Sequence, residues 1–170
     1  AKDILLKGIK TIKDENEISE IYGTLGDLFY AVGDNKNAYK SYSKSIKSNS
    51  NNARVLNNYS YYLALEGKNL AKALEMSTNA VNLEPNNSTY IDTKGWVLFT
   101  MEKYEEAREV LRTAIAKSGS ESAVINEHYG DALFKTGNID GAYVYWLKAK
   151  ELGGGSTSLD TKINTKSYVP

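Results

Sequence analysis

Residues 88–119, STYIDTKGWVLFTMEKYEEAREVLRTAIAKSG, read as two amphipathic helices with a break at residues 101–103. Apolar side chains recur three and four positions apart on both sides of the break, which is the spacing of one helix face. Trp96 stands directly after Gly95, off the face that this spacing sends to a core. The stretch predicts a helical hairpin and raises the question of what the tryptophan does.

The same pattern occurs four times along the chain. Small residues in the second helices are 34 or 35 residues apart: Ala38, Ala73, Ala107 and Ala142. Small residues in the first helices have the same period: Gly26, Ser60, Gly95 and Gly130. Small side chains let two helices cross closely, and a fixed period of this length is typical of stacked helical hairpins. The sequence therefore predicts an all-α solenoid.

In phase, these features resemble the tetratricopeptide repeat (TPR) family. The resemblance places four repeats in a single domain of residues 1–170, at residues 19–52, 53–87, 88–121 and 123–156. The pattern is broken at Ser60 and Lys94, where the family usually has glycine and an apolar residue. The resemblance implies a right-handed superhelix whose first helices line a concave groove. It also assigns residues 1–15 to an orphan helix, left from a partial N-terminal repeat.

The resemblance further implies which side chains face the groove. The candidate contacts for a partner are aromatic, acidic and amide side chains: Asp27, Tyr30, Asn57, Tyr61, Asp92, Trp96, Phe99, Glu127 and Asp131. Large rigid rings supply much contact area at a small entropy cost, which favours an aromatic binding strip. The same rings could instead pack between neighbouring repeats. For Trp96 the sequence leaves both interpretations open.

These features predict a non-enzymatic protein–protein interaction scaffold that binds a peptide or a partner helix in an acidic, aromatic groove. The alternative is a glycan-binding accessory protein of the cell surface or periplasm, because Tyr and Trp rings beside Asp and Asn can stack on sugars. Some TPR grooves hold a C-terminal carboxylate with a lysine–asparagine–arginine clamp. That clamp is absent here, since Gly23 and Asp27 stand at two of its positions.

Charge and composition disfavour several other classes. Lys+Arg and Asp+Glu both number 21, so there is no basic excess to bind nucleic acid or an anionic membrane. The chain has no cysteine and one histidine, which leaves no thiolate or histidine-pair metal site. We expect no cofactor, no metal and no catalytic residue. His128 is interpreted as a packing residue, and the GGGS at residues 153–156 as a linker.

The two ends of the chain carry further expectations. Leu159 and Ile163 predict a short helix in the capping segment, residues 157–170, that covers the last repeat. The final NTKSYVP is expected to be extended or disordered, or to enter the groove of a neighbouring molecule. In that case Lys166 would meet the acids and Tyr168 the aromatics.

The chain starts at Ala1 within a helical pattern, which we interpret as a processed or truncated N-terminus. No apolar run approaches the length of a membrane span. The 13 tyrosines and the lack of cysteine favour a periplasmic or surface-exposed bacterial protein. The sequence does not assign the compartment, the oligomeric state or the identity of the partner.

Overall fold

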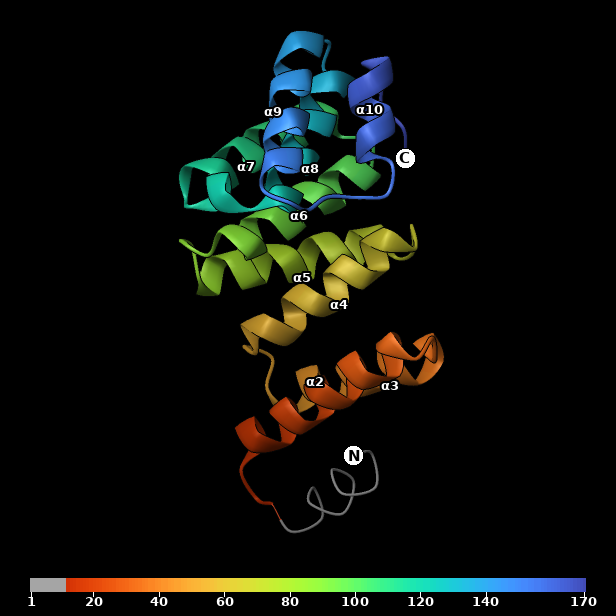
Figure 1. Ribbon diagram of the computed structural model, residues 1–170. Helices are drawn as coiled ribbons and strands as arrows, with labels where there is room; N and C mark the ends of the chain where they lie inside the picture. Colours follow the sequence, from red (N-terminus) through yellow and green to blue (C-terminus); the bar gives the residue numbers. More distant parts are fainter. Residues whose placement is uncertain (1–11) are drawn as a thin grey trace.

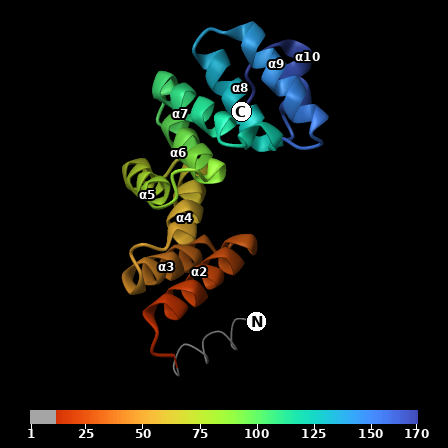
Figure 2. The same ribbon diagram turned by 90° about the vertical axis from the view of Figure 1, so that its left-hand side faces the viewer.

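The computed structural model describes residues 12–170, which form a curved stack of helices without any strand (Figure 1; Figure 2). The stack consists of four antiparallel hairpins: α2 (Glu15–Ala31) with α3 (Asn35–Ser48), α4 (Ala53–Leu65) with α5 (Leu70–Leu83), α6 (Ser88–Thr100) with α7 (Tyr104–Ala116), and α8 (Ala123–Lys135) with α9 (Ile139–Glu151). A 3₁₀ turn, η1 (Gly119–Glu121), precedes α8, and α10 (Leu159–Thr165) follows α9. The predicted all-α solenoid is confirmed.

The orphan helix predicted at residues 1–15 lies mostly outside the described residues. Residues 12–14 are not helical, and Asp14 is the N-cap of α2, whose first residue is Glu15. No helix among residues 12–170 combines the length and the apolarity that crossing a lipid bilayer requires.

The hairpins join in chain order through their first helices. α4 contacts α6 and α6 contacts α8, while α5 and α7 each pack against the first helix of the next hairpin. The first helices therefore form a continuous row. We call the side of the stack on which α2, α4, α6 and α8 lie the concave face.

The small residues of the repeat lie at the helix crossings. Ala107 and Ala142 are fully buried. A Cβ atom on Gly95 or Gly130 would lie 2.6 Å from the side chain of Leu111 or Trp146, respectively, which is closer than real Cβ contacts. The missing side chain of each glycine leaves room for a large side chain of the second helix. The two helices can approach each other closely for that reason.

The second hairpin fills the same crossing in another way. Ser60 replaces the glycine of the first helix, and Ser77 replaces the large residue of the second helix. Both serines are fully buried, and their hydroxyls donate to the carbonyl oxygens of Asn57 and Leu74. The added volume on one helix is balanced by the lost volume on the other, so the departure from the family pattern keeps the packing.

The hairpin turns need a left-handed residue after the first helix. Gly33, Gly67 and Gly137 supply it, with φ values of 78°, 62° and 87°. The third hairpin has Glu102 at this place, with φ 61°. A residue with a Cβ atom is disfavoured in this conformation, so the turn between α6 and α7 carries a strain that the other three turns avoid.

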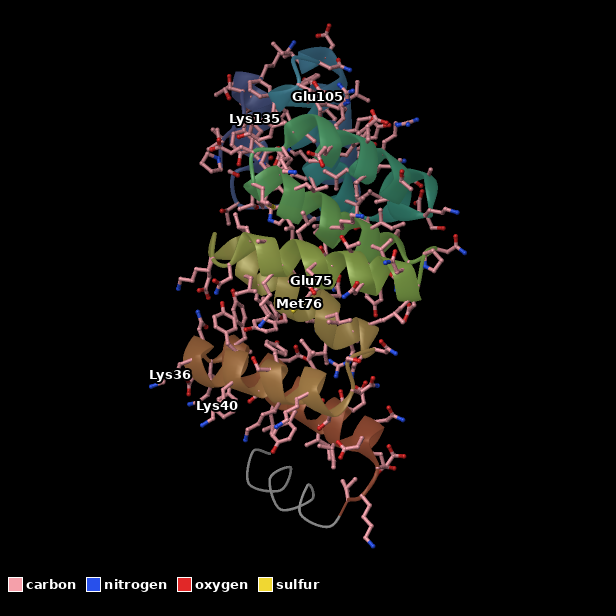
Figure 3. The ribbon with its side chains drawn as sticks, turned by 180° about the vertical axis from the view of Figure 1, so that it is seen from behind. Lys36, Lys40, Glu75, Met76, Glu105 and Lys135 are labelled. Carbon is pink, nitrogen blue, oxygen red and sulfur yellow. The ribbon has the colours of Figure 1, made fainter. Side chains whose placement is uncertain are left out.

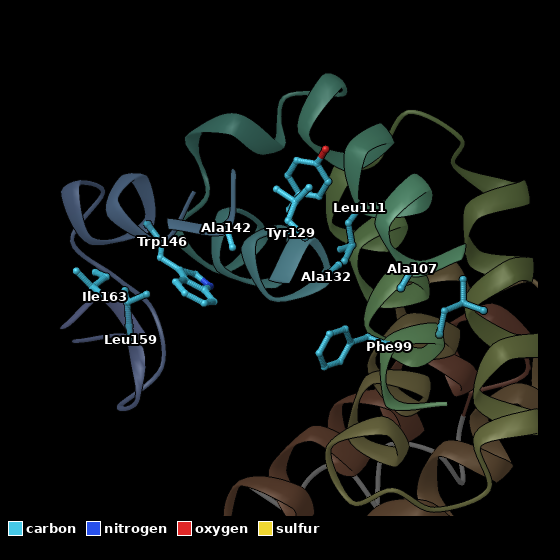
Figure 4. Packing of buried hydrophobic residues seen from close by; sticks show 12 residues of the cluster. Phe99, Ala107, Leu111, Tyr129, Ala132, Ala142, Trp146, Leu159 and Ile163 are labelled. Carbon is cyan, nitrogen blue, oxygen red and sulfur yellow. The ribbon is translucent and has the colours of Figure 1, made fainter. Parts of the chain in front are cut away.

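The short helix α10 covers the last hairpin. Leu159 and Ile163 belong to the same buried cluster as Trp146 and Ala149 of α9 (Figure 4). Figure 1 shows α10 beside α9, at the end of the stack opposite α2 and α3. The cap therefore buries the apolar side of the last hairpin, which no further repeat covers in the described chain.

Candidate partner-binding face

The concave face contains a cleft of about 310 Å³ between α4, α6 and α8 that is lined by both polar and apolar side chains. We call it the central cleft. It is lined by amide, hydroxyl, carboxylate and apolar side chains: Asn57, Asn58, Tyr61, Thr89, Asp92, Thr93, Ser122, Val124 and Ile125. Three of the nine predicted contact residues, Asn57, Tyr61 and Asp92, meet in this cleft. It offers a bound molecule both hydrogen-bond acceptors and apolar surface.

Buried polar groups form part of the cleft wall. The Asn57 amide nitrogen donates to Asn58 Oδ1 at 3.2 Å, while Asn57 Oδ1 has no hydrogen-bond partner among the described residues. The Asp92 carboxylate oxygens lie 3.0 and 3.1 Å from His128 Nδ1. Burial alone would lower the pKa of His128, but the Asp92 charge and hydrogen bond raise it above its ordinary value. The pair fixes the imidazole ring against the neighbouring tryptophan.

Trp96 is partly buried and packs between two rings. Its indole stacks on His128, with centroids 4.0 Å apart and planes at 15°, and on Phe99, with centroids 4.9 Å apart and planes at 7°. It also lines a second concave cavity of about 350 Å³. The two ring contacts agree with the packing interpretation of Trp96, and its place in the cavity wall leaves the binding interpretation as a prediction.

The second cavity lies between the concave face and the C-terminal segment. We call it the tail cavity. Helix residues Tyr61, Trp96 and His128 line it on one side, and Lys162 and Tyr168 line it on the other. Tyr61 and Val124 border the central cleft as well, so the two hollows are neighbours.

A buried ion-pair cluster holds the C-terminal segment to α8. Lys162 Nζ lies 2.8 Å from both Glu127 Oε1 and Asp131 Oδ2, and all three side chains are almost fully buried. The backbone N–H and the hydroxyl of Ser156 donate to Glu127, and the Trp146 indole N–H donates to Asp131 at 2.9 Å. Two predicted groove acids therefore bind the chain's own lysine.

Burial and the neighbouring charges shift the pKa values of the two carboxyls in this cluster. Burial raises the pKa of the Asp131 carboxyl to about 6, although Lys162 acts against the shift. Burial would also raise the pKa of Glu127, but hydrogen bonds from Lys162 and Ser156 lower it below its ordinary value. Both carboxyls are thus ionised at neutral pH, as the contact with Lys162 requires.

The two candidates in the first hairpin have partners as well. Asp27 accepts hydrogen bonds from the Tyr42 hydroxyl at 2.6 Å, from Arg54 at 2.8 Å and from the Asn58 amide at 3.1 Å. Tyr30 stacks on Tyr62, with ring centroids 3.7 Å apart. Both side chains join the first hairpin to α4.

The expectation of an acidic groove therefore needs a correction. Asp27 faces Arg54, Asp92 faces His128, and Glu127 and Asp131 share Lys162. The sequence places the carboxylates correctly on first helices but does not show that basic groups from other elements reach them. Among residues 12–170, no group of three or more histidine, cysteine or acidic side chains is arranged to hold a metal ion.

The tail also differs from its predicted course. NTKSYVP folds back on its own molecule, where the Tyr168 ring lies 5.7 Å from the Phe99 ring. The lysine that meets the acids is Lys162 rather than Lys166. The signal was present in the sequence, because Lys162 directly precedes Ile163 and follows Leu159 by three positions, on the side of α10 that packs inward.

Comparison with known proteins agrees with this architecture. The tetratricopeptide repeat family matches residues 19–52 and 93–155. The cellulose synthase operon protein C of Pseudomonas fluorescens is 33% identical over 94 residues, covering 55% of this chain. The type IV pilus assembly protein PilF of Pseudomonas aeruginosa is 26% identical over 147 residues, covering 85% of this chain. The chain spans only 7% and 58% of the lengths of these two proteins.

Solved structures show the same fold at low identity. The PilF structure from Pseudomonas aeruginosa has a TM-score of 0.76 and 23% identity, over 97% of this chain and 77% of that one. PilW, a type IV pilus biogenesis factor, has a TM-score of 0.79 and 15% identity, over 95% and 74% of the two chains. YrrB, a TPR protein with an unusual peptide-binding site, has a TM-score of 0.71 and 18% identity, over 95% and 81%. With four helical hairpins in one register and two matched segments, the chain belongs to the tetratricopeptide repeat family.

Proposed function

We propose that the chain is a non-enzymatic scaffold that binds a segment of a partner protein in the central cleft. The TPR fold supports a protein–protein interaction scaffold in general, and solved TPR relatives include peptide-binding proteins. The finer proposal is that Asn57, Tyr61 and Asp92 contact the partner directly. Trp96 then contributes through the neighbouring tail cavity.

The observation that carries this proposal is the composition of the central cleft. An extended peptide needs acceptors for its N–H groups and apolar surface for its side chains. The cleft combines Asp92 and Asn58 with Tyr61, Val124 and Ile125 in about 310 Å³, and the C-terminal segment does not line it. The cleft therefore suits part of a protein segment, with neighbouring surface left for the rest.

The other predicted contacts have a supporting role in this proposal. Asp27 and Tyr30 hold the first hairpin against α4, and Glu127 and Asp131 hold α10. The relatives suggest the class of partner. PilF and PilW are described as assembly or biogenesis factors of the type IV pilus, so we propose a partner that is itself part of a protein assembly. No feature of the cleft favours a glycan over a protein segment.

Site-specific photo-cross-linking in the native cell tests the proposal. A benzophenone amino acid replaces Thr89, an exposed residue that lines the central cleft, and Glu75 of α5 in a matched control (Figure 3). We expect a discrete cross-linked protein from position 89 that is lost when Tyr61→Ala is added. Cross-links from position 75 with none from position 89 would contradict the proposal.

A further inference from the structure

The C-terminal segment has two parts that are held with different strength. Leu159 and Ile163 anchor α10 in the buried core, and Lys162 adds the ion pairs to α8. We call residues 166–170 the strap. The strap begins with a reversal of the chain at Lys166, where φ is 49°. One hydrogen bond, from the Ser158 hydroxyl to the Val169 carbonyl at 3.2 Å, ties the strap to the start of α10.

Tyr168 is the part of the strap that enters the concave face. Its ring lies 5.7 Å from Phe99 of α6. The ammonium groups of Lys135 and Lys162 lie over the same ring, 4.4 and 5.3 Å from its centroid. Two cations and one aromatic ring around the Tyr168 ring form a site that recognises an aromatic side chain. We call Phe99, Lys135 and Lys162 the aromatic subsite.

The strap covers a hollow that a partner can use. Tyr168 and Pro170 line the tail cavity opposite Trp96 and His128. Removing α10 would uncover Trp146 and take away the cation that Glu127 and Asp131 share, which is strongly unfavourable. Lifting the strap beyond Ser167 breaks the Ser158–Val169 hydrogen bond and the ring and cation contacts of Tyr168, while the Ser167 N–H stays bonded to the Lys162 carbonyl. The strap is therefore the element that can move while the fold stays intact.

From this difference we propose that Tyr168 is an internal stand-in for an aromatic residue of the partner. The proposal rests on the function proposed above and names the chemistry of one partner contact: a tyrosine or phenylalanine side chain that enters the aromatic subsite and displaces Tyr168. The partner segment then runs from the central cleft into the tail cavity, past Tyr61. The attached strap competes for the aromatic subsite at an effective concentration in the millimolar range. We therefore expect it to weaken the binding of the partner by about tenfold or more.

A labelled peptide of residues 164–170, NTKSYVP with both ends blocked, is the probe. It is titrated into the full chain, into Tyr168→Ala, and into Tyr22→Ala on α2 as a matched tyrosine control far from the strap. Fluorescence anisotropy should show saturable binding to Tyr168→Ala and at least about tenfold weaker binding to the other two chains. The same peptide with alanine in place of its tyrosine should not bind any of them.

Two further chains keep the outcome interpretable. Ser158→Ala loosens the strap without removing Tyr168, and it should bind the probe with an intermediate affinity. Phe99→Ala, added to Tyr168→Ala, should abolish binding while circular dichroism confirms that the helices remain. Equal binding to wild type and Tyr168→Ala would overturn the proposal, as would no binding to either folded chain.

The outcomes separate this inference from the function on which it rests. A cross-link at position 89 with no probe binding would keep the scaffold function and overturn the aromatic subsite. A wild-type chain that dimerises in sedimentation experiments, with the dimer lost in Tyr168→Ala, would assign the subsite to the strap of a second copy and overturn the partner as occupant.

Discussion

The first and last hairpins use one arrangement in two environments. In the first, Asp27 accepts a hydrogen bond from Tyr42 and faces Arg54 of the next hairpin. In the last, Asp131 accepts a hydrogen bond from Trp146 and faces Lys162 of α10. The helix α10 thus supplies the last hairpin with the basic partner that a following repeat supplies to the first.

The two arrangements differ in exposure. The side chains of Arg54 and Asp27 are 37% and 31% exposed, whereas those of Lys162 and Asp131 are 3% and 1% exposed. Solvent screens the first ion pair and leaves it with little net energy. The second excludes water, so loss of its cation would strand two charges in the interior. One sequence pattern is thus a surface contact at one end of the stack and a structural requirement at the other.

The largest expected effect follows from removing the two basic partners. Lys162→Ala leaves Glu127 and Asp131 buried without a cation, and we expect it to lower the free energy of unfolding by about 3–5 kcal/mol. Arg54→Ala at the exposed site should cost about 1 kcal/mol or less. Urea unfolding of both variants measures the difference. Equal losses would show that exposure does not distinguish the two ends.

A second contrast concerns the helix crossings. Gly130→Ala would place a methyl group against the Trp146 ring, which is rigid and fully buried, and should cost about 1–3 kcal/mol. Ser60→Ala at the equivalent place in the second hairpin removes a hydroxyl and adds no volume, so it should cost less. A thermal unfolding midpoint that falls further for Ser60→Ala than for Gly130→Ala would contradict the packing account.

The buried cluster also predicts a pH dependence. Folding raises the pKa of Asp131 from 3.8 to about 6 and raises that of His128 above 6.5. A raised pKa stabilises the fold below the unfolded value, and this stabilisation is lost as the pH rises through the folded value. These two groups should therefore make the chain more stable at about pH 5.5 than at about pH 8.

The pair Asp131→Asn and His128→Gln tests this dependence. Each change removes one of the titrating groups, so the difference in melting temperature between the two pH values should shrink. Glu127 acts in the opposite direction at acid pH. Because its pKa is lowered in the folded chain, its contribution to stability is lost only when the pH falls below the ordinary carboxyl range. A pH profile unchanged in the double variant would show that the cluster does not control stability.

Much of this arrangement could be predicted from the sequence. The period of the small residues fixed the hairpins and their crossings, because helix packing depends on residues at regular spacing. Register then placed Asn57, Tyr61 and Asp92 on first helices. The spacing of α10 shows that Lys162 faces inward, but the pairing of the basic groups with these carboxylates could not be predicted in the same way. Arg54 follows Asp27 by 27 residues and Lys162 follows Asp131 by 31, and no local pattern links such distant side chains.

The smallest expected effect lies in the turn of the third hairpin. Glu102 adopts φ 61° where the other three turns have glycine. Glu102→Gly should raise the free energy of unfolding by about 0.5–1 kcal/mol, since glycine adopts this conformation without a steric penalty and only its greater unfolded entropy opposes the gain. Chemical denaturation checks the gain, with Arg112→Gly at an exposed position inside α7 as a control that should destabilise.

The central claim, that the concave face binds a protein segment through the central cleft, is tested most directly by the affinity of the partner captured at position 89. Its cross-linked segment, made as a peptide, is titrated calorimetrically into wild type, Tyr61→Ala and the control Glu75→Ala on α5. We expect Tyr61→Ala to weaken binding by about 2 kcal/mol, or roughly thirtyfold, and Glu75→Ala to leave it unchanged. Unchanged affinity in a folded Tyr61→Ala chain would contradict the account.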